Sequence, residues 1–323
     1  MRGLPTEGTE QGKPLLVKRQ PGAGKLQNKH KLFLMAFPFL VITFIFYYLP
    51  ISGWIYAFYD YIPGIPLKDT PFAGLKWFKS IVANPTQTAE VLRVMKNTLA
   101  MSSLGIVTSF LPLIFAILLA EIRHGWYRKL AQTLTTIPNF ISWILVYALA
   151  FSLFSVDNGV ITALLARLGM VPEDYNFLAS SSHIWLKMII WYWWKSLGWG
   201  AILYLAAIAG IDQDLYEAAE TDGAGRFRKI WHITVPGLMP TFFVLLLLSI
   251  GNFVNNGMEQ YFAFQNAMNK DSIEVLDLYV YNIAFANNFP FATAVSMLKS
   301  IISVFLLFTA NTLSKAVRGE SII

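Results

Sequence analysis

Six long apolar segments dominate the sequence and limit what it can fold into. A helix needs about 20 mainly apolar residues to cross a hydrocarbon layer about 30 Å thick, and each segment reaches that length. In lipid every backbone group must be hydrogen-bonded within a helix or a closed barrel, and the short alternating segments of barrel strands are absent. The sequence therefore predicts an all-α integral membrane protein with six transmembrane helices. The predicted spans are residues 32–58, 97–120, 130–154, 184–209, 237–257 and 291–312.

The composition excludes most soluble and enzymatic classes. Only 14% of the 323 residues are charged and 55% are hydrophobic, whereas soluble domains carry about 25% charged residues. Cysteine is absent, which excludes disulfides, thiolate metal sites and thiol nucleophiles. The four histidines show no metal-ligand spacing, and Asp212 and Asp214 are more typical of helix caps than of catalytic carboxylates. We therefore expect no catalytic residue, no metal site and no enzymatic activity in this chain.

The distribution of Lys and Arg predicts the orientation of the spans. With residue 1 on the cytoplasmic side, the cytoplasmic segments hold 15 of the 25 basic residues and the outer segments hold 7. The positive-inside rule then places both termini in the cytoplasm. The net charge of +6 thus reflects topology, and no nucleic acid is expected as a partner.

Two regions follow from this pattern. Residues 1–31 combine basic side chains with scattered Gly and Pro, which is typical of a flexible cytoplasmic tail, and residues 32–323 form the six-helix domain. The piece Gly22-Ala23-Gly24-Lys25-Leu26 lacks the first glycine and the final Ser or Thr of a phosphate-binding loop. We therefore expect no nucleotide or other cofactor to bind this chain.

A polar cytoplasmic loop, residues 210–236, interrupts the most hydrophobic part of the chain. Asp214, with Glu217 three residues on, predicts the start of a short helix, and Gly223 predicts its end because glycine adopts the left-handed conformation at low cost. A second short helical run carries basic residues and should end before Pro236. One face of the predicted helix carries mostly small side chains, which lets it dock closely into a groove of a partner. Its residues at helical spacing are Leu215, Ala218, Ala219 and Asp222.

The spacing of this loop carries a resemblance. The loop resembles the EAA loop of membrane subunits of ATP-driven (ABC) importers. The pattern that carries the resemblance is Glu217-Ala218-Ala219, three residues, Gly223, nine residues, Ile233, one residue, and Val235-Pro236. Val235 stands where the family more often has Leu. The resemblance implies a type I ABC importer permease fold and a loop that docks into a cleft of the ATP-hydrolysing subunit. Its coupling residues would be Glu217, Ala218, Ala219, Asp222, Gly223 and Pro236. The alternative is an ordinary amphipathic loop of another membrane protein.

Further segments are similar to the sugar-importer branch of these permeases, and closest to permeases for complex oligosaccharides such as alginate. They include residues 72–78, 97–99, 192–204, 279–281 and 292–294. The resemblance implies a second homologous permease, two ATP-hydrolysing subunits that bind ATP and Mg, an external solute-binding protein, and a place in the inner membrane. A neutral oligosaccharide remains an alternative substrate. An ion-driven secondary transporter is a further alternative, but the inverted repeats and intramembrane acids typical of that class are absent.

Two mid-span lysines are candidates for the substrate pathway. Lys195 and Lys299 lie near the middle of the fourth and sixth spans, and no Asp or Glu lies within a span to pair with them. A charged side chain at mid-membrane normally faces a cavity or a partner. Either the two lysines attract a carboxylated sugar chain, or they bond to helix carbonyls or to another subunit.

Aromatic and amide side chains supply the other candidates. Trp191, Tyr192 and Trp194 could stack on sugar rings, although aromatic residues also form interface belts and helix contacts. Amide and carboxylate groups at the outer end of the fifth span could bind sugar hydroxyls, or could serve only the entry to a loop. These residues are Asn252, Asn256, Glu259 and Gln260.

Overall fold

The computed structural model describes residues 28–172 and 174–318, and within them the chain is helical apart from loops and one isolated bridge between Tyr59 and Phe72. The chain divides into two compact units, and the boundary along the sequence falls between Gly53 and Trp54. Most of the basic tail, together with the glycine-lysine piece at 22–26, lies outside the described residues.

The first unit consists mainly of the first predicted span. Helix α1 (Asn28–Thr43) starts four residues before the predicted boundary, continues as a π-helical turn, η1 (Phe44–Tyr48), and enters the 3-10 helix η2 (Leu49–Phe58). The change from the π-helical turn to the 3-10 helix occurs beside Pro50, which has no backbone N–H to donate to the preceding turn. Large apolar side chains along α1 and η1 are exposed, as expected for a helix that contacts lipid.

In the second unit the second span is longer than predicted. Helix α3 (Pro85–Val107) and helix α4 (Leu111–Ala120) together run over 36 residues and meet the length and hydropathy requirements of a span. Asn84 starts α3, because its side chain accepts hydrogen bonds from the Thr86 amide at 3.1 Å and the Gln87 amide at 3.4 Å. Asn97, where the sequence analysis begins the span, is therefore inside the helix.

The third predicted span is wrong as a single straight helix. Helix α5 (Gly125–Thr136) and the 3-10 helix η4 (Ile137–Phe140) meet α6 (Trp143–Phe154) at a bend of 106°. Pro138 supplies no backbone N–H donor, and the Ser142 hydroxyl starts the next helix by accepting from the Leu145 amide. The sequence analysis weighed only hydropathy here and overlooked the proline and the cap.

The fourth span is confirmed at both ends by α8 (Ile184–Ala209). It is followed, across a bend of 70°, by the short helix α9 (Gln213–Thr221). Four helices in the described residues satisfy the requirements of a span alone, and the count rises to six if each of the two bent pairs is one span. The six-helix prediction agrees with this count.

The fifth span starts earlier and ends earlier than predicted. Helix α10 (Arg226–Lys229), the π-helical turn η5 (Ile230–Thr234) and α11 (Val235–Gly251) form one helix from Arg226 to Gly251. The expected stop before Pro236 is wrong. In η5 the Val235 amide donates to the Ile230 carbonyl five residues back, and Pro236 then stands in the first turn of α11, where its missing N–H matters least.

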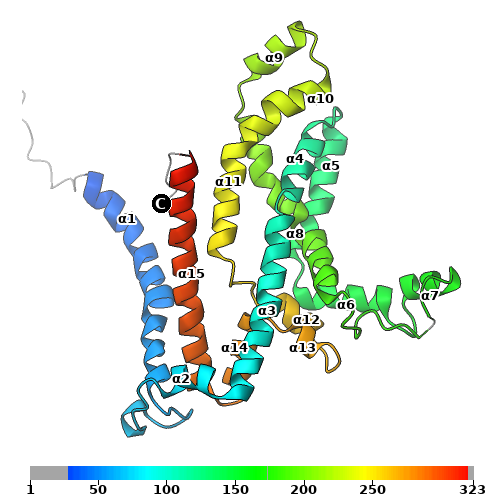
Figure 1. The fold of residues 1–323 in the computed structure, drawn as a ribbon. Helices are drawn as coiled ribbons and strands as arrows, with labels where there is room; N and C mark the ends of the chain where they lie inside the picture. Colours follow the sequence, from blue (N-terminus) through cyan, green and yellow to red (C-terminus); the bar gives the residue numbers. More distant parts are fainter. Residues whose placement is uncertain (1–27, 173, 319–323) are drawn as a thin grey trace, which may run out of the picture. The chain divides into compact units, whose positions relative to one another are not determined.

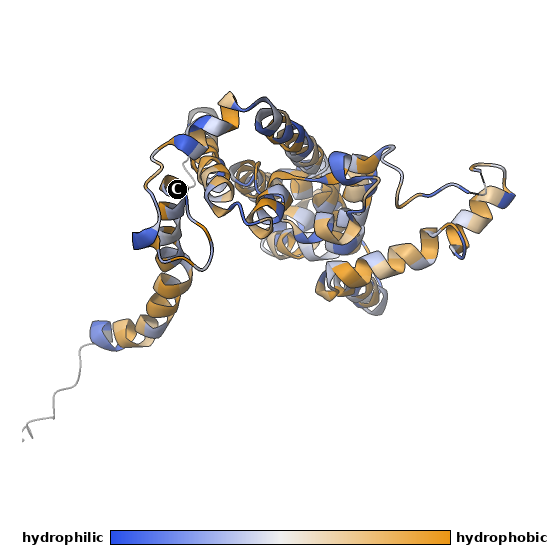
Figure 2. Cartoon of the chain, turned by 90° about the horizontal axis from the view of Figure 1, so that it is seen from below, coloured by the Kyte–Doolittle hydropathy of each residue, from blue (hydrophilic) through white to orange (hydrophobic). Residues whose placement is uncertain are grey.

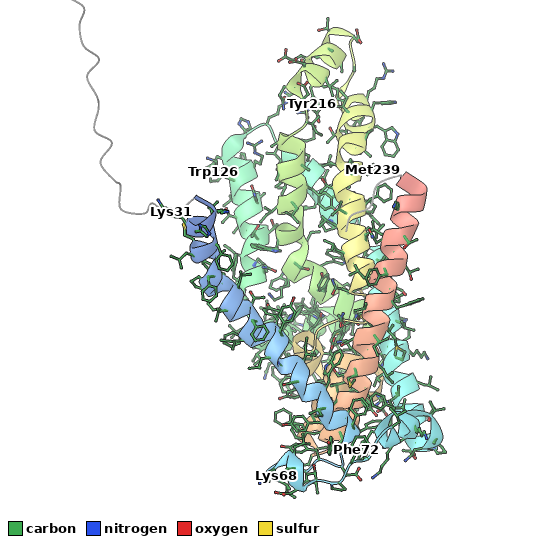
Figure 3. All side chains as sticks on the ribbon, turned by 90° about the vertical axis from the view of Figure 1, so that its left-hand side faces the viewer. Lys31, Lys68, Phe72, Trp126, Tyr216 and Met239 are labelled. Carbon is green, nitrogen blue, oxygen red and sulfur yellow. The ribbon has the colours of Figure 1, made fainter. Side chains whose placement is uncertain are left out.

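Short helices lie toward both ends of the second unit. In Figure 1, α9 and α10 lie at one end of the unit, whereas α2 and α14 lie toward the other end. Figure 3 shows the same separation through Tyr216 and Phe72. The sixth span lies within α15 (Phe289–Arg318). The shorter helices are η3 (Leu67–Asp69), α2 (Lys76–Ala83), α7 (Val160–Arg167), α12 (Glu259–Phe264), α13 (Lys270–Ile273) and α14 (Leu276–Phe285).

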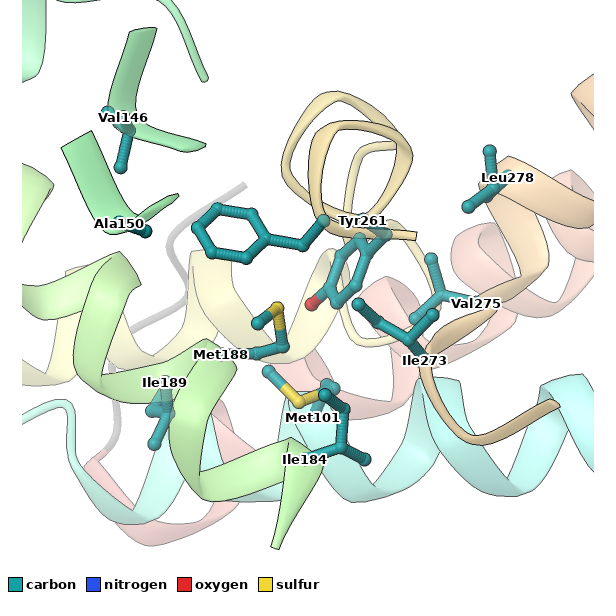
Figure 4. Packing of buried hydrophobic residues seen from close by; sticks show 11 residues of the cluster. Met101, Val146, Ala150, Ile184, Met188, Ile189, Tyr261, Ile273, Val275 and Leu278 are labelled. Carbon is teal, nitrogen blue, oxygen red and sulfur yellow. The ribbon is translucent and has the colours of Figure 1, made fainter. Parts of the chain in front are cut away.

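The main hydrophobic core joins the spans α3 and α8 to the short helices α12 and α13. Met101 of α3, Met188 of α8 and Tyr261 of α12 are each less than 5% exposed and belong to one cluster, which Figure 4 shows from close by. A second cluster joins α4, α8 and α11. Much of the remaining apolar surface is exposed, and Figure 2 shows hydrophobic residues all along the helices. A chain of this kind is buried in lipid or against other subunits.

Glycine permits the closest helix approach in the second unit. A Cβ on Gly198 of α8 would lie 2.4 Å from the Thr135 carbonyl group of α5, so only glycine fits there. Gly200, two residues on, leaves 3.2 Å to Pro112 of α4. The small residues of α8 therefore fix how the spans meet, as is common for helices in membranes.

Candidate functional site

The start of the polar loop differs in one residue from the prediction. Asp212, not Asp214, caps α9: its carboxylate accepts from the Asp214 amide at 3.0 Å. The helix therefore begins two residues earlier, and Asp214 lies in its first turn, where a negative charge is favoured by the helix dipole.

The end of α9 is as predicted. Gly223 has a φ of +75°, and a Cβ there would meet nothing within 4 Å. Its amide donates to the Glu220 carbonyl and the Ala224 amide donates to the Ala219 carbonyl, at 3.0 and 2.8 Å. These two bonds form a Schellman motif, in which a left-handed residue satisfies the last carbonyls of a helix.

Two side-chain contacts attach α9 and α10 to the rest of the second unit, and a third joins the two helices to each other. The Tyr216 hydroxyl lies 2.9 Å from the Thr234 hydroxyl of η5. Lys229 donates to Glu220 at 3.0 Å, and Arg226 Nε lies 3.7 Å from a carboxylate oxygen of Glu121, just after α4. The sequence analysis missed these contacts, because each joins residues that lie well apart along the chain.

One face of α9 is exposed and makes no packing contact that covers it within the described residues. Glu217 and Ala218 are exposed, Ala219 is half-buried, and Leu215 keeps 53% of its surface accessible. Asp222, Gly223 and Pro236 are also exposed. A short helix that is firmly attached at both ends and exposes small and apolar side chains can dock into a groove on another protein.

A cavity of about 460 Å³ lies at the other candidate site. Its wall comes from α3, α8, α11, α12 and the connection between the last two helices. Of the predicted pathway residues, four line it: Tyr192, Asn252, Asn256 and Gln260. The wall also carries serine hydroxyls and aromatic rings outside the set of predicted pathway residues, namely Ser102, Ser109, Ser196, Ser249, Trp193, Trp199, Tyr204, Phe242 and Tyr261.

Hydrogen bonds fix the polar part of this wall. Asn256 donates to the Ser102 hydroxyl at 3.0 Å, and the Gln260 amide donates to the Met188 carbonyl at 2.7 Å. Asn255 donates to the Ser303 hydroxyl of α15 at 3.0 Å. The cavity thus combines amide and hydroxyl groups with apolar walls, which is typical of sites for uncharged polar groups of a ligand.

The two mid-span lysines lie outside the lining residues. Lys195 is 9% exposed and donates to the Asn139 carbonyl at 2.6 Å, with its ammonium 5.5 Å from the Trp143 ring. The alternative of a helix carbonyl therefore holds for Lys195. Lys299 pairs with the Asp277 carboxylate of α14. Neither alternative for Lys299, a carboxylated sugar or a helix carbonyl or other subunit, included this acid, because Asp277 lies outside the predicted spans.

The other three predicted pathway residues also lie outside the lining. Trp191 contacts Phe154, Trp194 and Phe264 through its ring, and Trp194 is 40% exposed. Glu259 is exposed in the first turn of α12. The ring contacts of Trp191 are those of a packed side chain.

A buried charged cluster was also missed. Glu274 is 1% exposed and accepts from Arg93 and from Asn282, each at 2.7 Å, while Asn97 donates to the Glu274 carbonyl at 3.0 Å. The cluster ties α3 to the segment before α14. The sequence analysis assigned residues 258–290 to an outer loop, so it did not search that segment for buried partners.

Comparisons with known proteins identify the family. Residues 112–319 match the family of binding-protein-dependent transport system inner membrane components. The chain belongs to this family. As a member it is a membrane permease and not an enzyme, and ATP is hydrolysed by partner subunits of such transporters.

Relatives cover almost the whole permease. It is 38% identical over 299 residues to Protein LplB of Bacillus subtilis (strain 168), which covers 92% of each chain. It is 37% identical over 315 residues to the polygalacturonan/rhamnogalacturonan transport system permease protein YteP of the same organism, covering 97% of this chain and 94% of YteP.

Solved structures agree with the fold. The permease resembles a chain of a bacterial ABC transporter involved in the import of the acidic polysaccharide alginate, with a TM-score of 0.78 and 28% identity over 90% of this chain and 96% of that chain. For the alginate transporter in complex with its alginate pentasaccharide-bound periplasmic protein the TM-score is 0.79, at 28% identity over 91% and 97%. The type I ABC importer permease fold is thereby confirmed.

Proposed function

We propose that this permease forms part of the translocation pathway for an oligosaccharide, and that acidic oligosaccharides are its substrates. The observation that carries the proposal is the cavity, whose wall offers amides, hydroxyls and aromatic rings. Sugar hydroxyls need hydrogen-bond partners and sugar faces pack against rings, so such a wall suits a saccharide. Alternating access of this wall to the two sides of the inner membrane would move the substrate.

The acidic character of the substrate is supported by relatives. One is named for polygalacturonan and rhamnogalacturonan transport, and one structure belongs to an importer of the acidic polysaccharide alginate. The cavity lining itself carries no Lys or Arg within the described residues. A substrate carboxylate would therefore be received here by amide and hydroxyl donors, and selection for negative charge would fall to the partner subunits. A neutral oligosaccharide is the second candidate, since the same donors bind hydroxyls.

The partners in this proposal are a second homologous permease, two ATP-hydrolysing subunits that bind ATP and Mg, and an external solute-binding protein. Both termini and α9 would lie in the cytoplasm. Glu217 and Ala218 would then contact the ATPase, because they are exposed, and the turn at Gly223 would set the direction in which the chain leaves α9.

The test is uptake into proteoliposomes that contain the complete transporter and its binding protein. A galacturonic acid trimer and maltotriose serve as the acidic and neutral probes. We expect uptake of the acidic probe, and a loss of about tenfold when Asn256→Ala removes an amide from the cavity.

The matched control is Asn139→Ala, an asparagine outside the cavity lining whose backbone carbonyl stays available to Lys195. Uptake of maltotriose alone would favour the neutral alternative. If both variants transport the probe as fast as the unaltered protein, the cavity is not part of the translocation pathway.

A further inference from the structure

The connection between α11 and α12 carries three of the amides beside the cavity. It runs from Asn252 to Met258 without helical structure, and Asn252, Asn255 and Asn256 all line the cavity. A connection of this kind has few backbone bonds of its own, so contacts from neighbouring helices decide where its side chains point.

Asp277 of α14 holds one end of this connection. One carboxylate oxygen, Oδ2, accepts a hydrogen bond from the Gly257 amide at 2.9 Å, and the other, Oδ1, pairs with the Lys299 ammonium of α15. Gly257 has a φ of +71°, a left-handed backbone conformation that glycine adopts at low cost, and its amide is the group that the Asp277 carboxylate binds. The side chains of Asp277 and Lys299 are 20% and 14% exposed, and a pair this buried needs each member to compensate the other.

Two further contacts hold the same connection. Ser303 stands four residues after Lys299, so both point from one face of α15, and Ser303 accepts from Asn255. On the opposite side Ser102 of α3 accepts from Asn256 and donates to the Phe253 carbonyl. The connection is therefore fixed from α3, α14 and α15 together.

We propose that Asp277 and Lys299 are positioning residues for translocation. Asp277 orients the amide-bearing connection through Gly257, and Lys299 holds the Asp277 carboxylate in position through their ion pair. The inference rests on the proposed function of the cavity, and it gives Lys299 a role without contact to the substrate. The ammonium is occupied by Asp277, so Lys299 acts through the shape of the wall and not through attraction of a carboxylated sugar.

Two neutral double variants separate these roles. Asp277→Asn with Lys299→Gln removes both charges, keeps a side-chain oxygen that accepts from the Gly257 amide, and lets the two amides bond to each other. Asp277→Leu with Lys299→Met also removes both charges but leaves the Gly257 amide without an acceptor. Apolar replacement of a buried ion pair is often neutral or stabilising, so the second variant should assemble.

The assay is transport of the galacturonic acid trimer by the complete complex in proteoliposomes, measured against the concentration of loaded binding protein, together with the thermal midpoint of the complex. We expect the Asn/Gln variant to transport like the unaltered protein. We expect the Leu/Met variant to lose about tenfold in maximal rate, with an unchanged thermal midpoint and unchanged half-saturating concentration of binding protein.

A control variant repeats the Leu and Met replacement at the exposed pair Asp60 and Lys76, and its transport should not change. If both double variants at 277 and 299 transport normally, the positioning role is wrong. If both lose transport with the midpoint intact, the charge itself is needed and the inference is overturned. Failure of the proposed function looks different, because the unaltered complex would then not take up the galacturonic acid trimer, or Asn256→Ala would transport it as fast as the unaltered protein.

Discussion

Gly223 offers the sharpest test of the coupling loop, because its substitution changes one physical quantity. A Cβ at Gly223 would meet nothing within 4 Å, so no steric clash contributes. The only cost of Gly223→Ala is the φ of +75°, which disfavours an alanine by about 1–2 kcal/mol. At room temperature this cost corresponds to a factor of about 5–30 in an equilibrium constant.

We expect the cost to appear in the association of the permease with its ATPase subunit. The variant and unaltered permeases would be placed in nanodiscs, and the dissociation constant of the ATPase measured with and without the binding protein. Gly223→Ala should raise that constant by about 5–30-fold, and ATPase activity stimulated by loaded binding protein should fall accordingly. Gly223→Asn should lie between, since asparagine tolerates the left-handed conformation better than alanine.

Gly225→Ala is the matched control. Gly225 lies two residues away, also has open space around its missing Cβ, and has a φ of −68° that alanine adopts freely. Its substitution should leave association and ATPase activity unchanged. Equal effects at Gly223 and Gly225, or none at either, would refute the argument that the left-handed turn orients the docking helix.

Other substitutions test the packing and the caps. Gly198→Ala forces the backbone of α5 away from α8, so the thermal midpoint in detergent should fall by the equivalent of about 1–3 kcal/mol. Glu274→Gln removes the buried carboxylate that Arg93 contacts at 2.7 Å, while Arg93 keeps Asp271 at 3.3 Å, and should cost about 2 kcal/mol in chemical denaturation. Asp60→Asn at the more exposed pair with Lys76 should cost less than about 1 kcal/mol. Asp212→Ala removes the cap of α9 and should weaken ATPase association by about fivefold, with no change in thermal midpoint.

The spans and the turn that ends α9 could be predicted from the sequence because their signals are local. Hydropathy over about 20 residues marks a span regardless of its partners, and α8 follows that rule at both ends. Gly223 likewise predicts the turn after α9, because glycine alone adopts the left-handed backbone conformation at low cost. The bend after α5 was just as local, and Pro138 with Ser142 would have revealed it had capping been weighed beside hydropathy.

The polar contacts within the unit could not be predicted in the same way. Lys299 and Asp277 are separated by 22 residues, and Arg93 and Glu274 by 181 residues, so no periodicity connects them. The decisive fact is that the start of α14 is buried, with Leu276, Leu278 and Tyr279 in the core, although the pattern placed it in an outer loop. A charge in an apolar stretch, such as Asp277 between Leu276 and Leu278, is the one local sign of such burial.

The uninterrupted helix from Arg226 to Gly251 has a mechanical consequence. It starts just after α9, the helix proposed to dock on the ATPase, and ends at the connection that carries the cavity amides. Its 26 residues make a rod about 39 Å long, and a tilt of about 10° at one end would displace the other by about 7 Å. A small rotation imposed by ATP-driven closure outside the membrane would thus reach Asn252 amplified by length alone, with no relay of side chains in between.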